Sequence, residues 1–194
     1  VTSEKFSGYA QDYPLSGMPF AVTGLSDREY ALLAGWVKQG AVIPDEPVTL
    51  TDGEKESLQQ WESLLNRDDN RGKLVARWLY EHWFMATLYF PDLGGELRFF
   101  ELIRSVTAPG KDIIPIPTVF PNDDPEQPFF YRIRPISGSI LHKRRIPYPL
   151  SPAKQQRINE LFFAGEWTMG DLPGYSYAER VNPFATFAAI PAYA

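Results

Sequence analysis

The segment 71–90 constrains the fold of this chain more than any other. Its apolar residues, from Leu74 to Tyr89, lie on nearly every side of a helical wheel. A helix that is apolar all round is buried in a core or faces an apolar ligand. Asp68–Asn70 is a turn that offers an N-cap directly before it. We therefore predict a long central helix over Arg71–Phe90, against which the other elements pack.

Three further helices are indicated by their start signals. Capping boxes stand at Ser26–Glu29 and Thr51–Glu54, where each first side chain can bond the backbone of the fourth residue. Ser151 precedes a proline, a residue favoured at the first helical position. The predicted helices run from Ser26 to Gly40, from Thr51 to about Asn66, and from Ser151 to about Phe163.

After the central segment the pattern changes to strands. Arg98–Thr107, Ile113–Phe120 and Phe129–Ile136 are rich in aromatic and β-branched residues and are bounded by turn residues. Prolines in Ile113–Phe120 confine that strand to an edge or make it irregular. We expect Pro147–Pro149 to form a turn, and residues 164–194 to be a loop whose aromatics wrap the core. Separate runs of helices and strands predict the α+β class.

Composition excludes several functions. The chain has 194 residues, 44% of them hydrophobic, and a formal net charge of −5, so it lacks the broad basic footprint of nucleic-acid binding. It has no cysteine, which excludes disulfides, thiolate metal sites and a C-x-x-C-H haem attachment within the chain. Common nucleophile and nucleotide-binding motifs are missing. No signal peptide is present and both ends are abrupt, so we expect a fragment of a longer protein.

A methionine in the segment Gly17–Gly40 is the first candidate ligand. Met18 precedes a proline and so lies on extended backbone, just before the capped helix that carries Trp36 near its end. This order resembles the last part of a class I cytochrome c domain, where a Met-Pro segment supplies the second axial ligand of haem. Alternatively, Met18 fills an apolar gap, as most methionines do. We predict the tail of a cytochrome-c-like domain over 1–45 and a mixed α+β domain over 46–194.

The tripeptide Tyr80-Glu81-His82 lies inside the predicted central helix. His82 shares a stripe with Trp78 and Ala86, four residues away on either side. Two interpretations stay open, namely a hydrogen-bonded core histidine and a ligand or acid–base group. Glu81 is the carboxylate that stands out in an apolar setting.

Two groups of cations are candidates for binding anions. Arg132 and Arg134 share one strand face and could hold a phosphate or carboxylate by bidentate contacts. We favour ion pairs for these arginines, with candidate partners Glu96, Glu101, Asp123 and Asp124. A second group is the run His142, Lys143, Arg144 and Arg145. It is either a basic surface loop or a binding site for anionic headgroups or haem propionates.

Five segments together resemble the bacterial fatty acid cis/trans isomerase family. They are GMPFAVTGLSDREYALLAGWVKQGA, KLVARWLYEHWFMATLYF, FFELIRSVTAPG, NDDPEQPFFYRIRPISGSILHKRRIPYPL and GYSYAERVNPFATFAAIPA. Members of that family are periplasmic haem c proteins. They convert cis double bonds of membrane phospholipid acyl chains to trans without moving the bond, as a response to solvents or heat.

The resemblance implies roles for the candidate residues. Met18 would ligate haem in the intact protein, Tyr80, Glu81 and His82 would lie near the reaction site, and the cations Arg132, Arg134, His142, Lys143, Arg144 and Arg145 would face headgroups or propionates. The implied partners are unsaturated phospholipid acyl chains, reached by peripheral membrane contact. The family's C-x-x-C-H motif and C-terminal region are not in this chain, so we expect the fragment alone to be inactive.

Two alternatives differ in class from this isomerase. One is an electron-transfer cytochrome fragment joined to a lipid-binding or interaction module. The other is a lipid-binding accessory domain without haem. A cytochrome alone does not need so many further residues rich in aromatics, which favours the enzyme.

Overall fold

The computed structural model describes residues 2–14, 16, 25–42, 48–95, 97–136 and 146–194. Contacts between residues divide the chain into two compact units, Val1–Pro47 and Val48–Ala194, and each unit is considered by itself. Helices and a four-stranded mixed sheet make this an α+β protein, as predicted.

The first unit contains a 3-10 turn η1 (Ser3–Lys5) and the helices α1 (Phe6–Asp12) and α2 (Asp27–Lys38). The predicted capping box of α2 is confirmed. The Ser26 backbone N–H donates to the Glu29 carboxylate at 2.8 Å, and the Glu29 N–H donates to the Ser26 hydroxyl at 3.3 Å. Gly40 ends the helical region with φ +93°, a conformation that favours glycine. Met18 lies outside the described residues.

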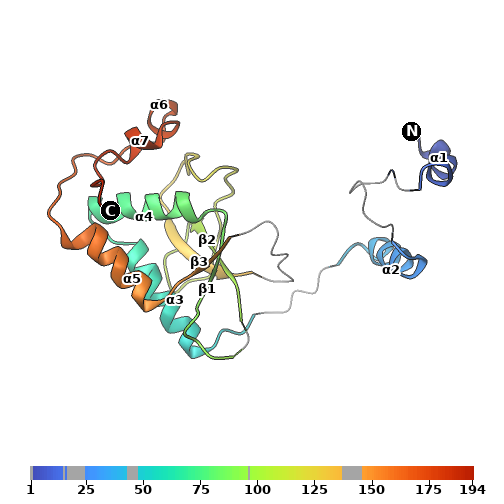
Figure 1. Cartoon of the computed structure of the whole chain (residues 1–194), viewed down its shortest axis with the longest axis horizontal. Helices are drawn as coiled ribbons and strands as arrows, with labels where there is room; N and C mark the ends of the chain where they lie inside the picture. The colour runs from blue at the N-terminus through green and yellow to red at the C-terminus, as the bar shows by residue number, and fades with distance from the viewer. Residues whose placement is uncertain (1, 15, 17–24, 43–47, 96, 137–145) are drawn as a thin grey trace. The chain divides into compact units, whose positions relative to one another are not determined.

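The second unit holds the sheet and the remaining helices, drawn in Figure 1. Its elements are α3 (Asp52–Leu65), α4 (Asn70–Trp83), β1 (Ala86–Tyr89), β2 (Phe100–Ser105), β3 (Phe130–Pro135), β4 (Ile146–Pro149), α5 (Pro152–Asn159), a π-helical turn η3 (Glu160–Ala164), α6 (Tyr177–Arg180) and α7 (Pro183–Thr186). None of the helices in the described part of the chain is long and apolar enough to cross a membrane.

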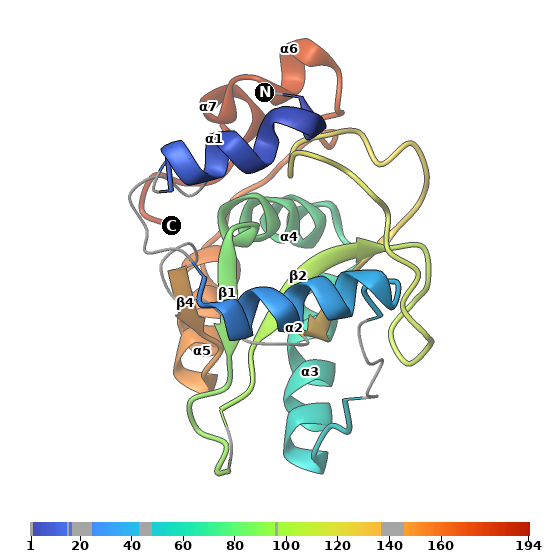
Figure 2. The ribbon, with the colours of Figure 1, turned by 90° about the vertical axis from the view of Figure 1, so that its right-hand side faces the viewer.

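The sheet has the strand order β3-β2-β1-β4. Its first three strands are antiparallel, whereas β4 runs parallel to β1. Helices α3, α4 and α5 cover one face of the sheet, as Figures 1 and 2 show. The core lies between these two layers. Its side chains from helices and strands include Trp61, Leu65, Leu79, Trp83, Leu88, Phe100 and Ile133.

The predicted long helix over 71–90 is wrong in its second part. α4 ends at Trp83, and the chain then forms strand β1. Thr87 and Leu88 point to opposite sides of the strand and are both buried. A strand covered on both faces has a continuous apolar run, which periodicity cannot distinguish from a buried helix.

Two segments that contain prolines also differ in part from their predictions. Ile113–Phe120 forms no regular strand, although the Val106 N–H still donates to the Ile114 carbonyl and the Ile116 N–H to the Arg104 carbonyl. The irregularity expected from its prolines is thus confirmed. Only Pro115 makes a bridge, to Ser105. Conversely, Pro147–Pro149 is not a turn but part of β4, paired with β1 from Ala86↔Ile146 onwards. Its position at the edge of the sheet is one that tolerates proline.

The C-terminal segment 164–194 wraps the core as expected, although it contains the short helices α6 and α7. Two arginines of α4 fix it by donating to backbone carbonyls. Arg71 donates to Phe162 O at 2.8 Å and to Gly165 O at 2.6 Å, and Arg77 donates to Pro173 O and Gly174 O at 2.9 and 2.8 Å.

Candidate functional site

Helix α4 positions three of the five described candidate residues, and contacts within a few residues fix its start. The Asp69 carboxylate accepts the Gly72 N–H at 2.8 Å, which caps the helix. Gly72 lies so close to Arg67 that a Cβ there would stand 2.4 Å from the Arg67 Cβ, so the turn into α4 requires glycine. Beyond this start, two opposite sides of α4 face two different hollows.

The first hollow, which we name the Arg77 hollow, has a volume of about 520 Å³ and is mostly apolar. Three segments enclose it: the end of α3 with the start of α4, the loop leading into β3, and the loop after η3. Its lining includes Leu65, Arg77, Phe129, Tyr131, Leu172 and Tyr175.

Arg77 is a buried cation at the wall of this hollow. Its Nε donates to Glu81 Oε1 at 2.8 Å, so the two residues form an ion pair one turn apart on α4. Its guanidinium carbon lies 4.0 Å from the centre of the Tyr175 ring. Glu81 therefore serves as the partner of Arg77, and Tyr175 covers that guanidinium.

Behind this wall lies a buried cluster of tyrosines around Arg104. Burial raises the pKa of Tyr80, although the nearby Arg104 and Thr118 oppose that rise. Burial also raises the pKa of Tyr131 well above its ordinary value, with Tyr175 adding to the effect and Arg104 opposing it. Both phenols consequently keep their protons near neutral pH and can donate hydrogen bonds but not act as bases.

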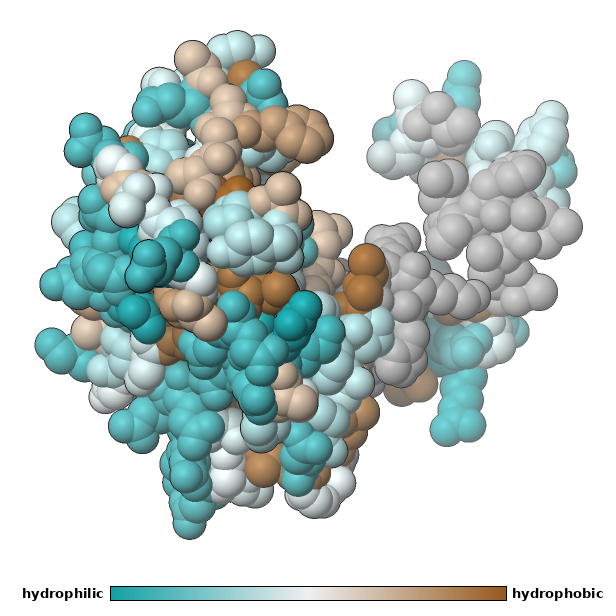
Figure 3. Space-filling view, turned by 60° about the vertical axis from the view of Figure 1, so that its left-hand side comes forward, coloured by the Kyte–Doolittle hydropathy of each residue, from teal (hydrophilic) through white to brown (hydrophobic). Residues whose placement is uncertain are grey.

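The second hollow, which we name the His82 hollow, has a volume of about 390 Å³ and lies between α4, α5 and the starts of β1 and β4. Its lining includes Trp78, His82, Met85, Ile146, Tyr148 and Lys154. Figure 3, in which the left-hand side of Figure 1 comes forward, shows apolar surface between hydrophilic side chains on that face of the molecule.

His82 is exposed, so the core interpretation of this histidine is wrong. Its ring stacks on Trp78 with the centroids 4.0 Å apart, and Nδ1 lies 2.7 Å from the Trp78 carbonyl oxygen. A carbonyl oxygen only accepts, so Nδ1 carries the proton in this contact and Nε2 is left as an acceptor. The side of α4 that carries Trp78 and His82 lines the His82 hollow and does not face the sheet.

The structure therefore separates the three consecutive candidates. Side chains that follow one another on a helix point about 100° apart. Tyr80 lies beside Arg104 and Tyr131, Glu81 pairs with Arg77, and His82 belongs to the other hollow.

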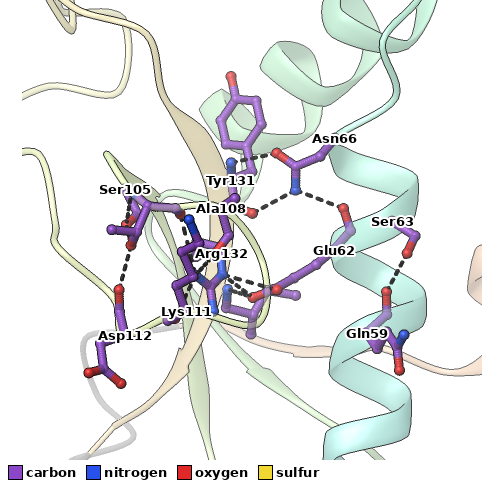
Figure 4. A network of polar contacts seen from close by, with 12 residues as sticks. Gln59, Glu62, Ser63, Asn66, Ser105, Ala108, Lys111, Asp112, Tyr131 and Arg132 are labelled. Carbon is purple, nitrogen blue, oxygen red and sulfur yellow. Dashed lines mark hydrogen bonds and ion pairs between the residues drawn. The ribbon is translucent and has the colours of Figure 1, made fainter.

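Arg132 and Arg134 form ion pairs, as we favoured. Arg132 Nε lies 3.0 Å from both carboxylate oxygens of Glu62, and Arg134 Nε lies 2.7 Å from Glu101 Oε1. Figure 4 shows the buried Glu62–Arg132 pair joining α3 to β3, with the Tyr131 ring on the opposite side of the strand. Glu62 was not among the expected partners, because the packing of α3 on β3 is not visible in the sequence.

The remaining candidates are Met18, His142, Lys143, Arg144 and Arg145, and all five lie outside the described residues. Within the described part of the chain, no three His, Cys, Asp or Glu residues come close enough together to hold a metal ion. His82 Nε2 is one accessible imidazole nitrogen, which alone does not make a haem site.

Sequence reasoning missed Arg77 and Arg104. The spacing of Arg77 and Glu81, four residues apart in a predicted helix, was a usable signal. Arg104 shares a strand face with Phe100 and Leu102, both buried, and this alternation also indicated a buried arginine.

An α+β unit with two largely apolar hollows flanking one helix defines a protein suited to an apolar or amphipathic ligand. The profile of the family described as fatty acid cis/trans isomerase matches residues 1–194, and the chain belongs to that family. Comparisons with curated proteins and with solved structures gave no match.

Proposed function

We propose that the intact protein converts cis double bonds of unsaturated acyl chains in membrane phospholipids to trans, with haem c as cofactor and without moving the bond. Membership of the family over every residue of the chain is the observation that carries this proposal. The periplasm and a peripheral contact with the membrane are the setting that we infer for it.

The Arg77 hollow is the site that we assign to the acyl chain. It combines a mostly apolar lining with convergent polar groups and with Tyr131, whose pKa burial raises, and this combination is typical of a ligand site. Leu65, Phe129 and Leu172 supply apolar walls. Tyr80 and Glu81 stay associated with the site through Tyr131 and Arg77, whereas His82 does not line it.

Rotation about a double bond requires temporary loss of its π character, and no atoms are gained or lost. Haem, when bound, would supply the withdrawal of electron density, and Met18 is the residue of this chain that we propose as its ligand. The described residues have a different task. They hold the acyl chain so that its double bond is presented, and they exclude water. The phenols of Tyr80 and Tyr131 keep their protons.

In this proposal the run His142, Lys143, Arg144 and Arg145 contacts the anionic headgroups of the surrounding membrane lipids. The charges of Arg132 and Arg134 are already used by Glu62 and Glu101, and Arg132 is buried. Binding a headgroup there would require breaking an existing ion pair, which disfavours the earlier assignment.

The decisive experiment fills one hollow at a time in the full-length haem protein. Leu172→Trp narrows the Arg77 hollow, and Met85→Trp is the control that narrows the His82 hollow, from a position that is more exposed than Leu172. Each protein is incubated with dioleoyl phosphatidylcholine vesicles, and trans chains are measured by gas chromatography. We expect Leu172→Trp to slow isomerisation at least tenfold and Met85→Trp to leave it unchanged. The reverse result would move the acyl site to the His82 hollow.

Failure of the haem-loaded wild type to form any trans chains would favour the electron-transfer alternative. A pyridine haemochrome assay without signal would favour the lipid-binding domain without haem. Met18→Ala should remove the low-spin thioether signature from the absorption spectrum, and an unchanged spectrum would exclude Met18 as the ligand.

A further inference from the structure

Two arginines are buried at the wall of the Arg77 hollow, and one carboxylate forms a direct ion pair with one of them. Arg77 is 5% exposed and Arg104 is 1% exposed. Among the ion pairs of the described residues, Arg77 has Glu81 as its partner but Arg104 has none. Arg104 donates to Thr118 Oγ1 at 2.9 Å and to the Asp123 carbonyl at 2.8 Å. The two buried cations thus have one carboxylate in ion-pair contact, Glu81, while side-chain and backbone hydrogen bonds, and to a lesser degree the charge of Arg77, lower the pKa of the exposed Glu179.

Hydrogen bonding of these guanidinium groups is also incomplete. In the part of the chain that the structure describes, Arg77 Nη2 and Arg104 Nε are buried N–H groups without a partner. Arg132 shows how a buried arginine is normally accommodated here. Its Nε bonds both oxygens of Glu62, and its Nη1 reaches the carbonyl of Ala108 at 2.7 Å. An unpaired buried donor on a charged group is costly, and each such case needs an explanation.

Both incomplete groups lie against rings that line the hollow. The Tyr175 ring centre is 4.0 Å from the Arg77 guanidinium carbon and 5.8 Å from that of Arg104, and the Phe129 ring centre is 5.6 Å from Arg104. Tyr175 is half-buried and belongs to the segment that follows η3, so its ring is the cover between the hollow and both cations.

Carboxylates at this hollow lie on the exposed rim. Asp68 pairs with Lys73, and Asp124 accepts the N–H of Glu126. The rim therefore has charges of both signs, whereas the buried end is positive. A ligand that is apolar along its length and anionic at one end would match this distribution.

We propose that Arg77, supported by Arg104, binds the anionic oxygen group of an amphipathic lipid, a carboxylate or a phosphate, whose chain occupies the Arg77 hollow. This inference rests on the proposed function, because it assumes that the acyl chain enters this hollow. A shift of the Tyr175 ring exposes Arg77 Nη2, which has no partner, so the anion binds there without breaking the contact between Glu81 and Arg77 Nε and competes with Glu81 only for the positive charge.

Displacement of cis-parinaric acid, followed by its fluorescence, tests the proposal. The competitors are oleate, methyl oleate and oleoyl lysophosphatidic acid, which share one chain and differ in the head. For the wild type we expect oleate or the lysophosphatidic acid to bind roughly tenfold to a hundredfold more tightly than methyl oleate, the range of a charge-assisted hydrogen bond. Whichever anion binds more tightly identifies the source as a carboxylate or a lipid phosphate.

Substitutions show which residues cause the preference for an anionic head over the methyl ester. Arg77→Met should bring oleate down to the affinity of methyl oleate, and Arg104→Met should reduce the preference severalfold. Glu81→Gln should increase it, because the competing carboxylate is gone. Arg134→Gln is the control and should change nothing, since Arg134 lies outside the hollow and pairs with Glu101. Circular dichroism checks that each variant is folded.

The ratio in the wild type needs no variant and is decisive if Arg77→Met does not fold. Equal affinities for methyl oleate and both anionic competitors would overturn the anion site and leave the proposed isomerase standing. A preference that survives in both arginine variants would also overturn it, by placing the anion elsewhere. Loss of trans product in vesicles with an intact binding preference would instead count against the proposed function alone.

Discussion

The buried pair between Glu62 and Arg132 makes a quantitative prediction about stability. Both residues are less than a tenth exposed, and Glu62 also accepts the Ile133 N–H at 2.9 Å. Glu62→Gln keeps the shape of the side chain but leaves the Arg132 guanidinium charged and buried without a counter-ion. Breaking a buried pair by removing one partner typically costs about 3–5 kcal/mol.

Urea unfolding followed by circular dichroism measures this cost, with tryptophan fluorescence as a second probe. In thermal unfolding of the same variant we expect a drop of roughly 6–20 °C, since each kcal/mol is worth about 2–4 °C in a unit of this size. The double variant Glu62→Leu with Arg132→Met should recover part of the loss, because it removes both charges together.

A surface pair supplies the control. The exposed side chains of Lys55 and Asp52 lie 2.9 Å apart on α3, and Lys55→Gln should cost much less free energy of unfolding than Glu62→Gln. If Glu62→Gln costs no more free energy of unfolding than Lys55→Gln, or if the double variant shows no coupling, the ion pair between Glu62 and Arg132 does not stabilise the packing of α3 on β3. Either result would refute the reasoning.

Three further predictions follow from single contacts. Because the pKa of Tyr131 is raised in the folded state, its contribution to the free energy of unfolding is fully present below pH 10, the ordinary pKa of the phenol. Above pH 10 the free energy of unfolding falls by up to about 1.4 kcal/mol per pH unit. Tyr131→Phe should therefore reduce the loss of the urea midpoint at alkaline pH. Asp69→Ala removes the N-cap of α4 and should cost about 1 kcal/mol in chemical denaturation, and no loss would contradict the capping role. His82→Ala should leave vesicle isomerisation within about twofold of wild type, because His82 faces the other hollow, and abolished turnover would restore it as a catalytic residue.

The sequence was most informative where a local rule decides the structure. Capping boxes at Ser26 and Thr51 and the Ser151-Pro152 start each placed a helix correctly, because they concern contacts within four residues. It was least informative at Ala86–Tyr89, where burial on both faces of a strand imitates a buried helix, and at Pro147–Pro149, where an edge position made prolines acceptable in a strand.

Long-range contacts explain the rest of the mismatch at the site. The partner of Arg132 lies 70 residues earlier in the chain, on α3, and the carbonyls that hold Arg77 lie 96 and 97 residues later. No local sequence pattern predicts contacts between residues so far apart in the chain. The preference for ion pairing could still be predicted from charge alone, because a buried arginine has few other stable arrangements.

The geometry of one helix decides how the candidates divide. Arg77 with Glu81, and Trp78 with His82, are two pairs of the same spacing that begin one residue apart. One residue rotates a side chain by about 100°, which is enough to send the first pair to one hollow and the second pair to the other. Residues adjacent in sequence therefore cannot all act on one double bond. If Met85→Trp stops the reaction and Leu172→Trp does not, then His82 lies at the acyl site, and the Arg77–Glu81 pair serves only to fasten the C-terminal segment to α4.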